Sequence, residues 1–166
     1  MIQLTDILPS PSTFLENLFK EIQELSIDIS RFECDHICYR IETIERYIEL
    51  KKEFEKIGEF LSEEIVANRP ISTFKLFEPI VYKYKIISCI ELPAPKKGSF
   101  YKEGWEHIEF VIDTSFDEFM VKYSNLRFNT SSVDKKINPE ISLKLENGSI
   151  KFHHFTLEYV VKVLQS

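Results

Sequence analysis

The chain has 166 residues, of which 43% are hydrophobic and 29% are charged, an ordinary balance for a globular protein. Its 21 basic and 27 acidic residues give a net charge of −6, which disfavours nonspecific nucleic-acid binding because such binding needs an excess of lysine and arginine. No apolar run approaches the roughly 20 residues of a membrane helix, and the first residues lack the pattern of a secretory signal. We therefore expect a cytoplasmic protein that binds neither nucleic acid nor membrane.

The first predicted element is an amphipathic helix over residues 11–29, where apolar side chains recur at helical spacing. It belongs to an N-terminal helical arm, residues 1–30. A first module follows over about 32–96, and Thr43 is placed to cap its helix. In this module we predict a strand over 32–41, a helix over 44–57, and strands over 59–67, 71–77 and 82–92.

A polar connector with two glycines, residues 96–104, leads to a second module over about 105–166. Asn147-Gly148 is a strong signal for a hairpin turn in this module. The predicted elements are a strand over 105–113, a helix over 116–124 capped by Thr114 or Ser115, strands over 126–133, 140–146 and 149–155, and a helix over 157–165 that begins after Thr156. Each module thus has the order strand, helix and three strands.

This order predicts a mixed α/β (α+β) fold. We expect two βαβββ modules that form one curved, partly closed barrel within a single domain over residues 1–166, with the N-terminal helix packed outside it.

The first strands of the two modules repeat one pattern, DHICYRI at 35–41 and EHIEFVI at 106–112. The repeat places His107 71 residues after His36. Histidine is the commonest metal ligand at neutral pH, so the repeat predicts two modules that face each other across a metal site. By strand alternation Cys34, His36, Cys38 and Arg40 would share one face, and we interpret the cysteines as buried free thiols rather than metal ligands.

The fourth strands offer further ligands. Glu91 ends the apolar run IISCIEL, where a carboxylate is costly unless it is paired or bound to a cation. His153 shares a face with Lys151, opposite Ile150 and Phe152. We therefore predict that His36, Glu91, His107 and His153 bind a divalent metal ion, and this set suits zinc, nickel, iron(II), cobalt or manganese. Hydrogen-bonded core histidines are the alternative interpretation.

Three segments resemble YecM-type metalloproteins of the vicinal oxygen chelate (glyoxalase/bleomycin resistance/dioxygenase) superfamily. They are NRPISTFKLFEPI, CIELPAPKKGSFYKEGWEHIEFVI and SIKFHHFTLEYVV, and the resemblance covers most of residues 30–163. It implies metal ligands on the first and fourth strands of both modules, which are His36, Glu91 and His107 here. The fourth ligand is usually a glutamate. Here His153 takes its place, with His154 and Glu158 as alternatives.

The resemblance also implies a metal-dependent isomerase, lyase or dioxygenase that acts on a small oxygen-chelating molecule. We expect Glu109, on the His107 face, to be a general base or an extra ligand, and Arg40, Arg69 and Tyr101 to bind the substrate. The protein would act as a monomer or a homodimer. Two alternatives stay open: a binding protein of the same fold that sequesters a small ligand, and a former enzyme in which the metal is structural.

Overall fold

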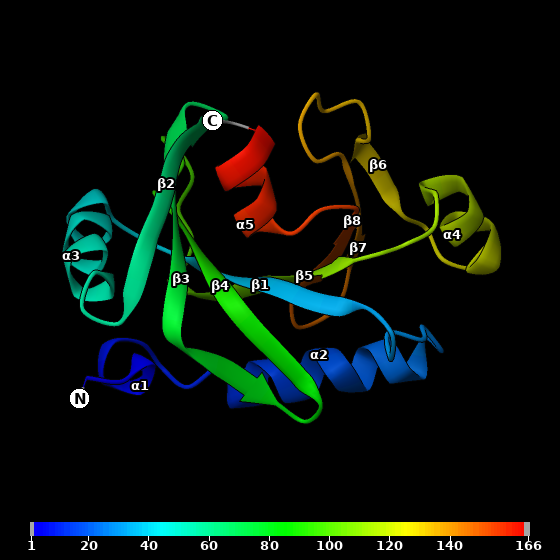
Figure 1. The fold of residues 1–166 in the computed structure, drawn as a ribbon, viewed down its shortest axis with the longest axis horizontal. Coiled ribbons are helices and arrows are strands. Elements are labelled where there is room, and N and C mark those ends of the chain that lie inside the picture. Colours follow the sequence, from blue (N-terminus) through cyan, green and yellow to red (C-terminus); the bar gives the residue numbers. More distant parts are fainter. Residues whose placement is uncertain (1, 165–166) are drawn as a thin grey trace.

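The computed structural model describes residues 2–164 and consists of one eight-stranded sheet with helices around it (Figure 1). The strands are β1 (Glu33–Arg40), β2 (Gly58–Val66), β3 (Arg69–Tyr82), β4 (Lys85–Pro93), β5 (Gly104–Val111), β6 (Asn129–Ser132), β7 (Glu140–Lys144) and β8 (Ser149–His153). The helices are α1 (Leu4–Ile7), α2 (Ser12–Glu24), α3 (Ile44–Phe54), α4 (Phe116–Lys122) and α5 (Leu157–Tyr159), which continues as a π-helical turn, η1 (Val160–Leu164). The predicted last helix reached residue 165, which lies outside the described residues. Within 2–164, every helix is too short or too polar to cross a bilayer.

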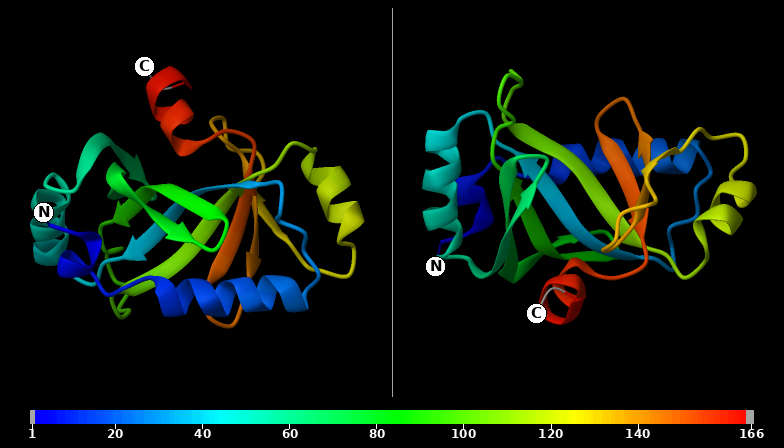
Figure 2. Two further views of the ribbon diagram at one scale, coloured as in Figure 1. Left: turned by 60° about the horizontal axis from the view of Figure 1, so that its bottom comes forward. Right: turned by 90° about the horizontal axis from the view of Figure 1, so that it is seen from above.

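The sheet order is β2-β3-β4-β1-β5-β8-β7-β6. The first half of the chain therefore supplies one side of the sheet and the second half supplies the other, each in the order strand, helix and three strands. β1 and β5 pair antiparallel at the centre, and each has its own fourth strand, β4 or β8, as a parallel neighbour on its other side. The sheet is strongly curved but does not close (Figures 1 and 2). This confirms the predicted α+β fold with two βαβββ modules.

The pairing of β1 with β5 is symmetric, because exchanging the two modules leaves the register unchanged. Residue 36 corresponds to residue 107 in the repeat, and residue 38 corresponds to residue 109. The register pairs His36 with Glu109 and Cys38 with His107, which are equivalent positions under this correspondence. Each strand also carries one extra residue next to its histidine, Asp35 in β1 and Glu106 in β5, where the register shifts. These bulges are equivalent too, and a bulge re-aims the side chain it carries.

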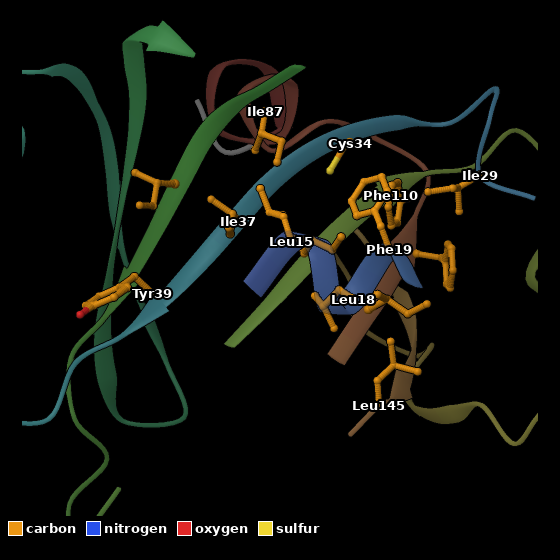
Figure 3. Packing of buried hydrophobic residues seen from close by; sticks show 14 of the residues in the cluster. Leu15, Leu18, Phe19, Ile29, Cys34, Ile37, Tyr39, Ile87, Phe110 and Leu145 are labelled. Carbon is orange, nitrogen blue, oxygen red and sulfur yellow. The ribbon is translucent and has the colours of Figure 1, made fainter. Parts of the chain in front are cut away.

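Helix α2 packs across one face of the sheet, as predicted for the N-terminal arm (Figures 1 and 3). Leu15, Leu18 and Ile22 of this helix are almost fully buried, and they join Phe110 of β5 and Phe152 of β8 in one hydrophobic core. Full burial of such a side chain contributes roughly 1.5–3 kcal/mol. Buried polar side chains of the central strands, His36, His107 and Glu109, lie on the opposite, concave side of the sheet.

The caps explain where three of the helices begin. Thr43 accepts a hydrogen bond from the backbone N–H of Arg46 at the start of α3, as predicted. At α4 the cap is Ser115 rather than Thr114, because Ser115 and Glu118 form a reciprocal capping box. Thr156 caps α5 through the backbone N–H of Tyr159. Helix α5 stands over the concave side of the sheet, between β2 and β8 (Figure 1).

Candidate metal centre

Four side chains from the central strands converge on the concave side of the sheet. His36 comes from β1, Glu91 from the end of β4, and His107 and Glu109 from β5, and their ligand atoms all lie within 4.8 Å of one another. The Nε2 atoms of His36 and His107 lie 3.2 and 3.1 Å from Glu109 Oε1. The same nitrogens lie 3.7 and 3.8 Å from Glu91 Oε2. The structure thus brings together three of the four predicted ligands, together with Glu109.

The Nε2 atoms of three neighbouring histidines share one feature. Nε2 of His36, His107 and His153 is buried, and none of the three makes a hydrogen bond to another described residue. Buried polar atoms are nearly always hydrogen-bonded, because an unpaired one costs free energy. Two of these atoms, on His36 and His107, belong to the group of four side chains that could hold a metal ion.

Asp35 orients the ring of His36. Its Oδ2 lies 2.8 Å from His36 Nδ1, and both side chains are almost fully buried. A neutral ring that donates its Nδ1–H to Asp35 presents the Nε2 lone pair to the cluster, which is the arrangement found behind metal-bound histidines. Glu106, at the equivalent bulge, lies behind His107 with a longer distance of 3.8 Å between Oε2 and Nδ1.

His153 lies beside the four-residue cluster, not in it. Its Nδ1 lies 2.5 Å from the carbonyl oxygen of Phe155, and its Nε2 lies 3.5 Å from Asp35 Oδ2 and 3.6 Å from Glu109 Oε2. It groups instead with Asp35 and His36. Glu109, rather than His153, completes the four-residue group with His36, Glu91 and His107.

The two alternatives to His153 are turned elsewhere. Nε2 of His154 lies 2.9 Å from the carbonyl oxygen of Thr114, and its ring packs against Phe116. Glu158 pairs with Lys75 at 2.8 Å. Among residues 2–164, neither belongs to a group of side chains that could share an ion.

The charges of the cluster depend on one another. Burial alone would raise the pKa of Glu109, but the neighbouring ammonium of Lys151 and the two imidazoles lower it well below its ordinary value. Glu91 behaves similarly: burial opposes its ionisation, but His36 lowers its pKa to about 2. Both side chains are therefore carboxylates at neutral pH, as metal ligands must be.

The two histidines differ in their pKa. Burial disfavours the charged form of His36, but Glu109, Glu91 and Asp35 outweigh burial and raise its pKa well above the ordinary value. For His107 burial and the charge of Lys151 prevail, so its pKa is lowered. Without an ion, His36 carries the proton and His107 is the neutral member of the pair.

Lys151 is a member of the site that the sequence analysis did not single out. Its Nζ lies 2.7 Å from Glu109 Oε1 and 3.5 Å from Glu140 Oε1. Burial tends to lower the pKa of Lys151, but Glu109, Glu140 and Glu91 raise it above its ordinary value, so the side chain is an ammonium.

The cluster forms the floor of a cleft of about 600 Å³. One wall comes from the β2–β3 hairpin with Ile65, Val66 and Ile71, and another from Val160 and Val161 beyond α5. Ile65 and Val66 are 70% and 45% exposed, so the hairpin offers apolar surface at the mouth. Such a cleft suits a small molecule with an apolar part.

Only one of the three residues predicted to bind substrate lines this cleft. Arg69 does so, with a buried Nε that lacks a hydrogen-bond partner among the described residues. Its Nη1 donates to the carbonyl oxygen of Ala94 and to the hydroxyl of Tyr101. Arg40 lies over the Tyr101 ring and donates from Nε to the carbonyl oxygen of Lys102. Arg40 and Tyr101 thus contact one another beside the cleft.

The cysteines pack as expected for free thiols. Cys34 belongs to the hydrophobic core, whereas Cys38 lines the cleft, because the bulge at Asp35 interrupts the alternation that would place them on one face. Burial raises the pKa of the Cys38 thiol well above its ordinary value, and Cys38 forms with Glu106 and His107 a second group of side chains that could hold a metal ion.

The comparisons with known proteins agree with this fold. A family model described as YecM protein matches residues 3–163. Protein YecM of Escherichia coli (strain K12) is 30% identical, over 99% of this chain and 95% of its own length. An uncharacterized protein of Haemophilus influenzae is 34% identical over 68% of this chain and 61% of its own.

Two solved structures show the same architecture at different distances. A structural-genomics target, Protein EC4020, superposes with a TM-score of 0.80 at 29% identity, covering 95% of this chain and 91% of its own. Methylmalonyl-CoA epimerase of Streptomyces coelicolor superposes with a TM-score of 0.53 at 13% identity, covering 74% and 96%, a likeness of fold alone. The chain therefore belongs to the YecM family and has the vicinal oxygen chelate fold.

Proposed function

We propose that the protein binds one divalent metal ion through His36, Glu91, His107 and Glu109, and that a small oxygen-chelating molecule binds to that ion in the cleft. The observation that carries this proposal is the set of unpartnered, buried Nε2 atoms aimed at two carboxylates. A cytoplasmic location and action without a macromolecular partner are part of the same proposal.

The spacing of the donor atoms supports a shared ion. Atoms bonded to one metal at about 2.1 Å lie roughly 3–4 Å apart. The four nitrogen–oxygen distances within the cluster are 3.1, 3.2, 3.7 and 3.8 Å. Little movement would therefore be needed to bind an ion. Two imidazoles and two carboxylates suit zinc, nickel, iron(II), cobalt or manganese, and these residues do not select among them.

We further propose that the protein is an enzyme of the isomerase, lyase or dioxygenase class. A divalent ion in such a site supplies a Lewis acid for oxygen atoms of the substrate. The chain contributes a cleft with apolar walls, and Arg69 and Lys151 as cations within it. Methylmalonyl-CoA epimerase, by its name an isomerase, shows that this fold can support such a reaction.

Glu109 suits the role of a ligand better than that of a general base. An effective general base has a pKa near the working pH, whereas the pKa of Glu109 lies well below its ordinary value. Its Oε1 already lies near both imidazole nitrogens. We therefore assign the carboxylate to the metal and leave the proton acceptor of the reaction unassigned.

A non-catalytic binding protein is the second candidate. It is favoured by the open, partly apolar mouth of the cleft, which could hold a ligand without a reaction. A panel of diols, keto acids and glutathione adducts separates the two candidates: turnover supports the enzyme, whereas binding without turnover supports the alternative.

The metal site is tested by calorimetric titration of the protein, purified without tag or chelator, with zinc, nickel, manganese and iron(II). We expect one ion per chain for the wild type and no measurable binding for His107→Ala. His154→Ala is the matched control, because His154 is bonded to Thr114 and faces away from the cluster. Equal heats for the wild type and His107→Ala would contradict the proposed site.

A further inference from the structure

Lys151 occupies the position in the second module that Glu91 occupies in the first. Cys38 of β1 pairs with Glu91 of β4, and Glu109 of β5, the equivalent of Cys38, pairs with Lys151 of β8. A carboxylate in one module is thus matched by an ammonium in the other. We propose that Lys151 replaces a fourth-strand metal ligand and binds the anionic group of the molecule in the cleft. This inference rests on the proposed function, and it identifies the ligand as an oxyanion.

The contacts of Lys151 connect it directly to the metal ligands. Glu109 Oε1 lies 2.7 Å from Lys151 Nζ, and the same oxygen faces Nε2 of both His36 and His107. An ion bound by these residues and the ammonium of Lys151 therefore compete for one oxygen atom. Once that oxygen is bound to an ion, its interaction with Lys151 is weaker, and the ammonium can donate a hydrogen bond to another anion.

The remaining contacts of Lys151 leave a donor available. An ammonium has three N–H donors, and the described residues offer Lys151 two carboxylates, from Glu109 and from Glu140 at 3.5 Å. Glu140 is shared with Lys135, which lies 3.0 Å away at the rim. The Lys151 side chain is 21% exposed and lines the cleft, so an anion that enters can reach it.

The charge of the cleft supports an anionic ligand. Among the lining residues, five glutamates and four basic side chains give a net charge of −1 when the lining histidines are neutral, or 0 when His36 holds a proton. A divalent ion bound by neutral histidines changes the net charge to +1. The metal-loaded cleft would therefore attract an anion more than the empty one, and Lys151 is the cation in contact with Glu109.

The walls of the cleft indicate the shape of this anion. Ile65 and Val66 on one side and Val160 and Val161 on the other are apolar and lie above the charged floor. A small acid that chelates through adjacent oxygens and carries an apolar substituent fits both features. A 2-oxo acid is the simplest molecule of this chemical class.

The test compares pyruvate with pyruvamide, which has similar shape and chelating oxygens but no charge. Metal uptake is measured first, and binding of each probe to the zinc- or nickel-loaded protein is then followed by calorimetry. We expect the wild type to bind pyruvate at least tenfold more tightly than pyruvamide. Lys151→Met should take up metal at least as tightly as the wild type and lose most of this preference, because only the ion then favours the anion. Lys151→Arg should retain more of it.

Lys135→Met is the matched control, since it removes a cation that pairs with Glu140 but does not contact Glu109. It should keep most of the preference for pyruvate. The inference, but not the proposed function, would be overturned by either of two results. One is normal metal uptake and an unchanged preference in Lys151→Met, and the other is normal metal uptake without any preference in the wild type. Failure of the wild type to take up metal would overturn the proposed function, and this inference with it, before any probe is added.

Discussion

The backbone N–H of Leu157 donates a hydrogen bond to Asp35 Oδ2, the oxygen that also faces Nδ1 of His36. Both contacts measure 2.8 Å. One buried carboxylate therefore holds the first residue of α5 and the ring of a proposed metal ligand. The helix that covers the concave side of the sheet is thus tied to the metal site through Asp35.

This relationship predicts that Asp35→Asn weakens metal binding. The amide keeps the shape of the side chain but accepts a weaker hydrogen bond from His36 and lacks the charge that makes the ring a better ligand. We expect a 10- to 100-fold loss of metal affinity in calorimetry. Glu106→Gln is the comparison, and its effect should be smaller because Glu106 lies 3.8 Å from His107. An affinity unchanged in Asp35→Asn would show that His36 needs no such support.

Metal affinity should rise with pH beyond the ordinary histidine range. The pKa of His36 is raised by Glu109, Glu91 and Asp35 against the effect of burial, so a proton occupies the ring up to a higher pH than usual. Because the ion must displace this proton, affinity increases until the pH exceeds the raised pKa. Titrations in two buffers of different ionisation enthalpy would also detect the released proton. An affinity that is constant between pH 6.5 and 8 would contradict this prediction.

The protein without metal should be stabilised by Glu91 at neutral pH and lose that contribution in acid. Burial raises the pKa of Glu91, but His36 lowers it from 4.5 to about 2 in the folded protein. The contribution is complete above the unfolded value and disappears as the pH falls through the folded one. The interval from 4.5 to about 2 corresponds to at most roughly 3 kcal/mol. Urea unfolding of the wild type and Glu91→Gln between pH 2 and 7 measures it, and a difference that does not shrink in acid would refute it.

Lys85 should be among the most important buried polar side chains for stability. It is 4% exposed, and its Nζ donates to the carbonyl oxygens of Ile29, Ser30 and Phe32, which lie in the segment between α2 and β1. Lys85→Met leaves these carbonyls without their donor, and we expect a loss of about 3 kcal/mol in unfolding free energy. Lys52→Met on the exposed side of α3 is the control and should change little. Equal stabilities would mean that water replaces the ammonium.

The fold could be predicted because the two modules repeat both their order of elements and their first-strand sequence. Hydrophobic periodicity located α2, and alternation in β8 correctly assigned Ile150 and Phe152 to the core. Alternation failed at Cys34, since the extra residue Asp35 reverses the face of the strand before His36. A bulge depends on how two strands pair, which one strand's pattern does not reveal. The prediction of a single domain stays a prediction.

The site could be predicted in part for the same reason. The acid–histidine repeat located His36 and His107, and the cost of a buried carboxylate located Glu91. The signal for Asp35 and Glu106 was also present, because an acid precedes each histidine. Lys151 needed the register of two strand pairs to be recognised. Arg40 was chosen because alternation placed it on the His36 face, and Tyr101 because it lies in the connector. Neither criterion says whether a side chain reaches the cleft.

The matched register of β1 and β5 has a consequence for how the two modules divide the work. The fourth strand of the first module ends in an acid beside the proposed ion, whereas the equivalent position in the second holds a base. Because the backbone frame is the same on both sides, the side chain at this one position decides whether a fourth strand contributes an acid or a base to the shared cleft.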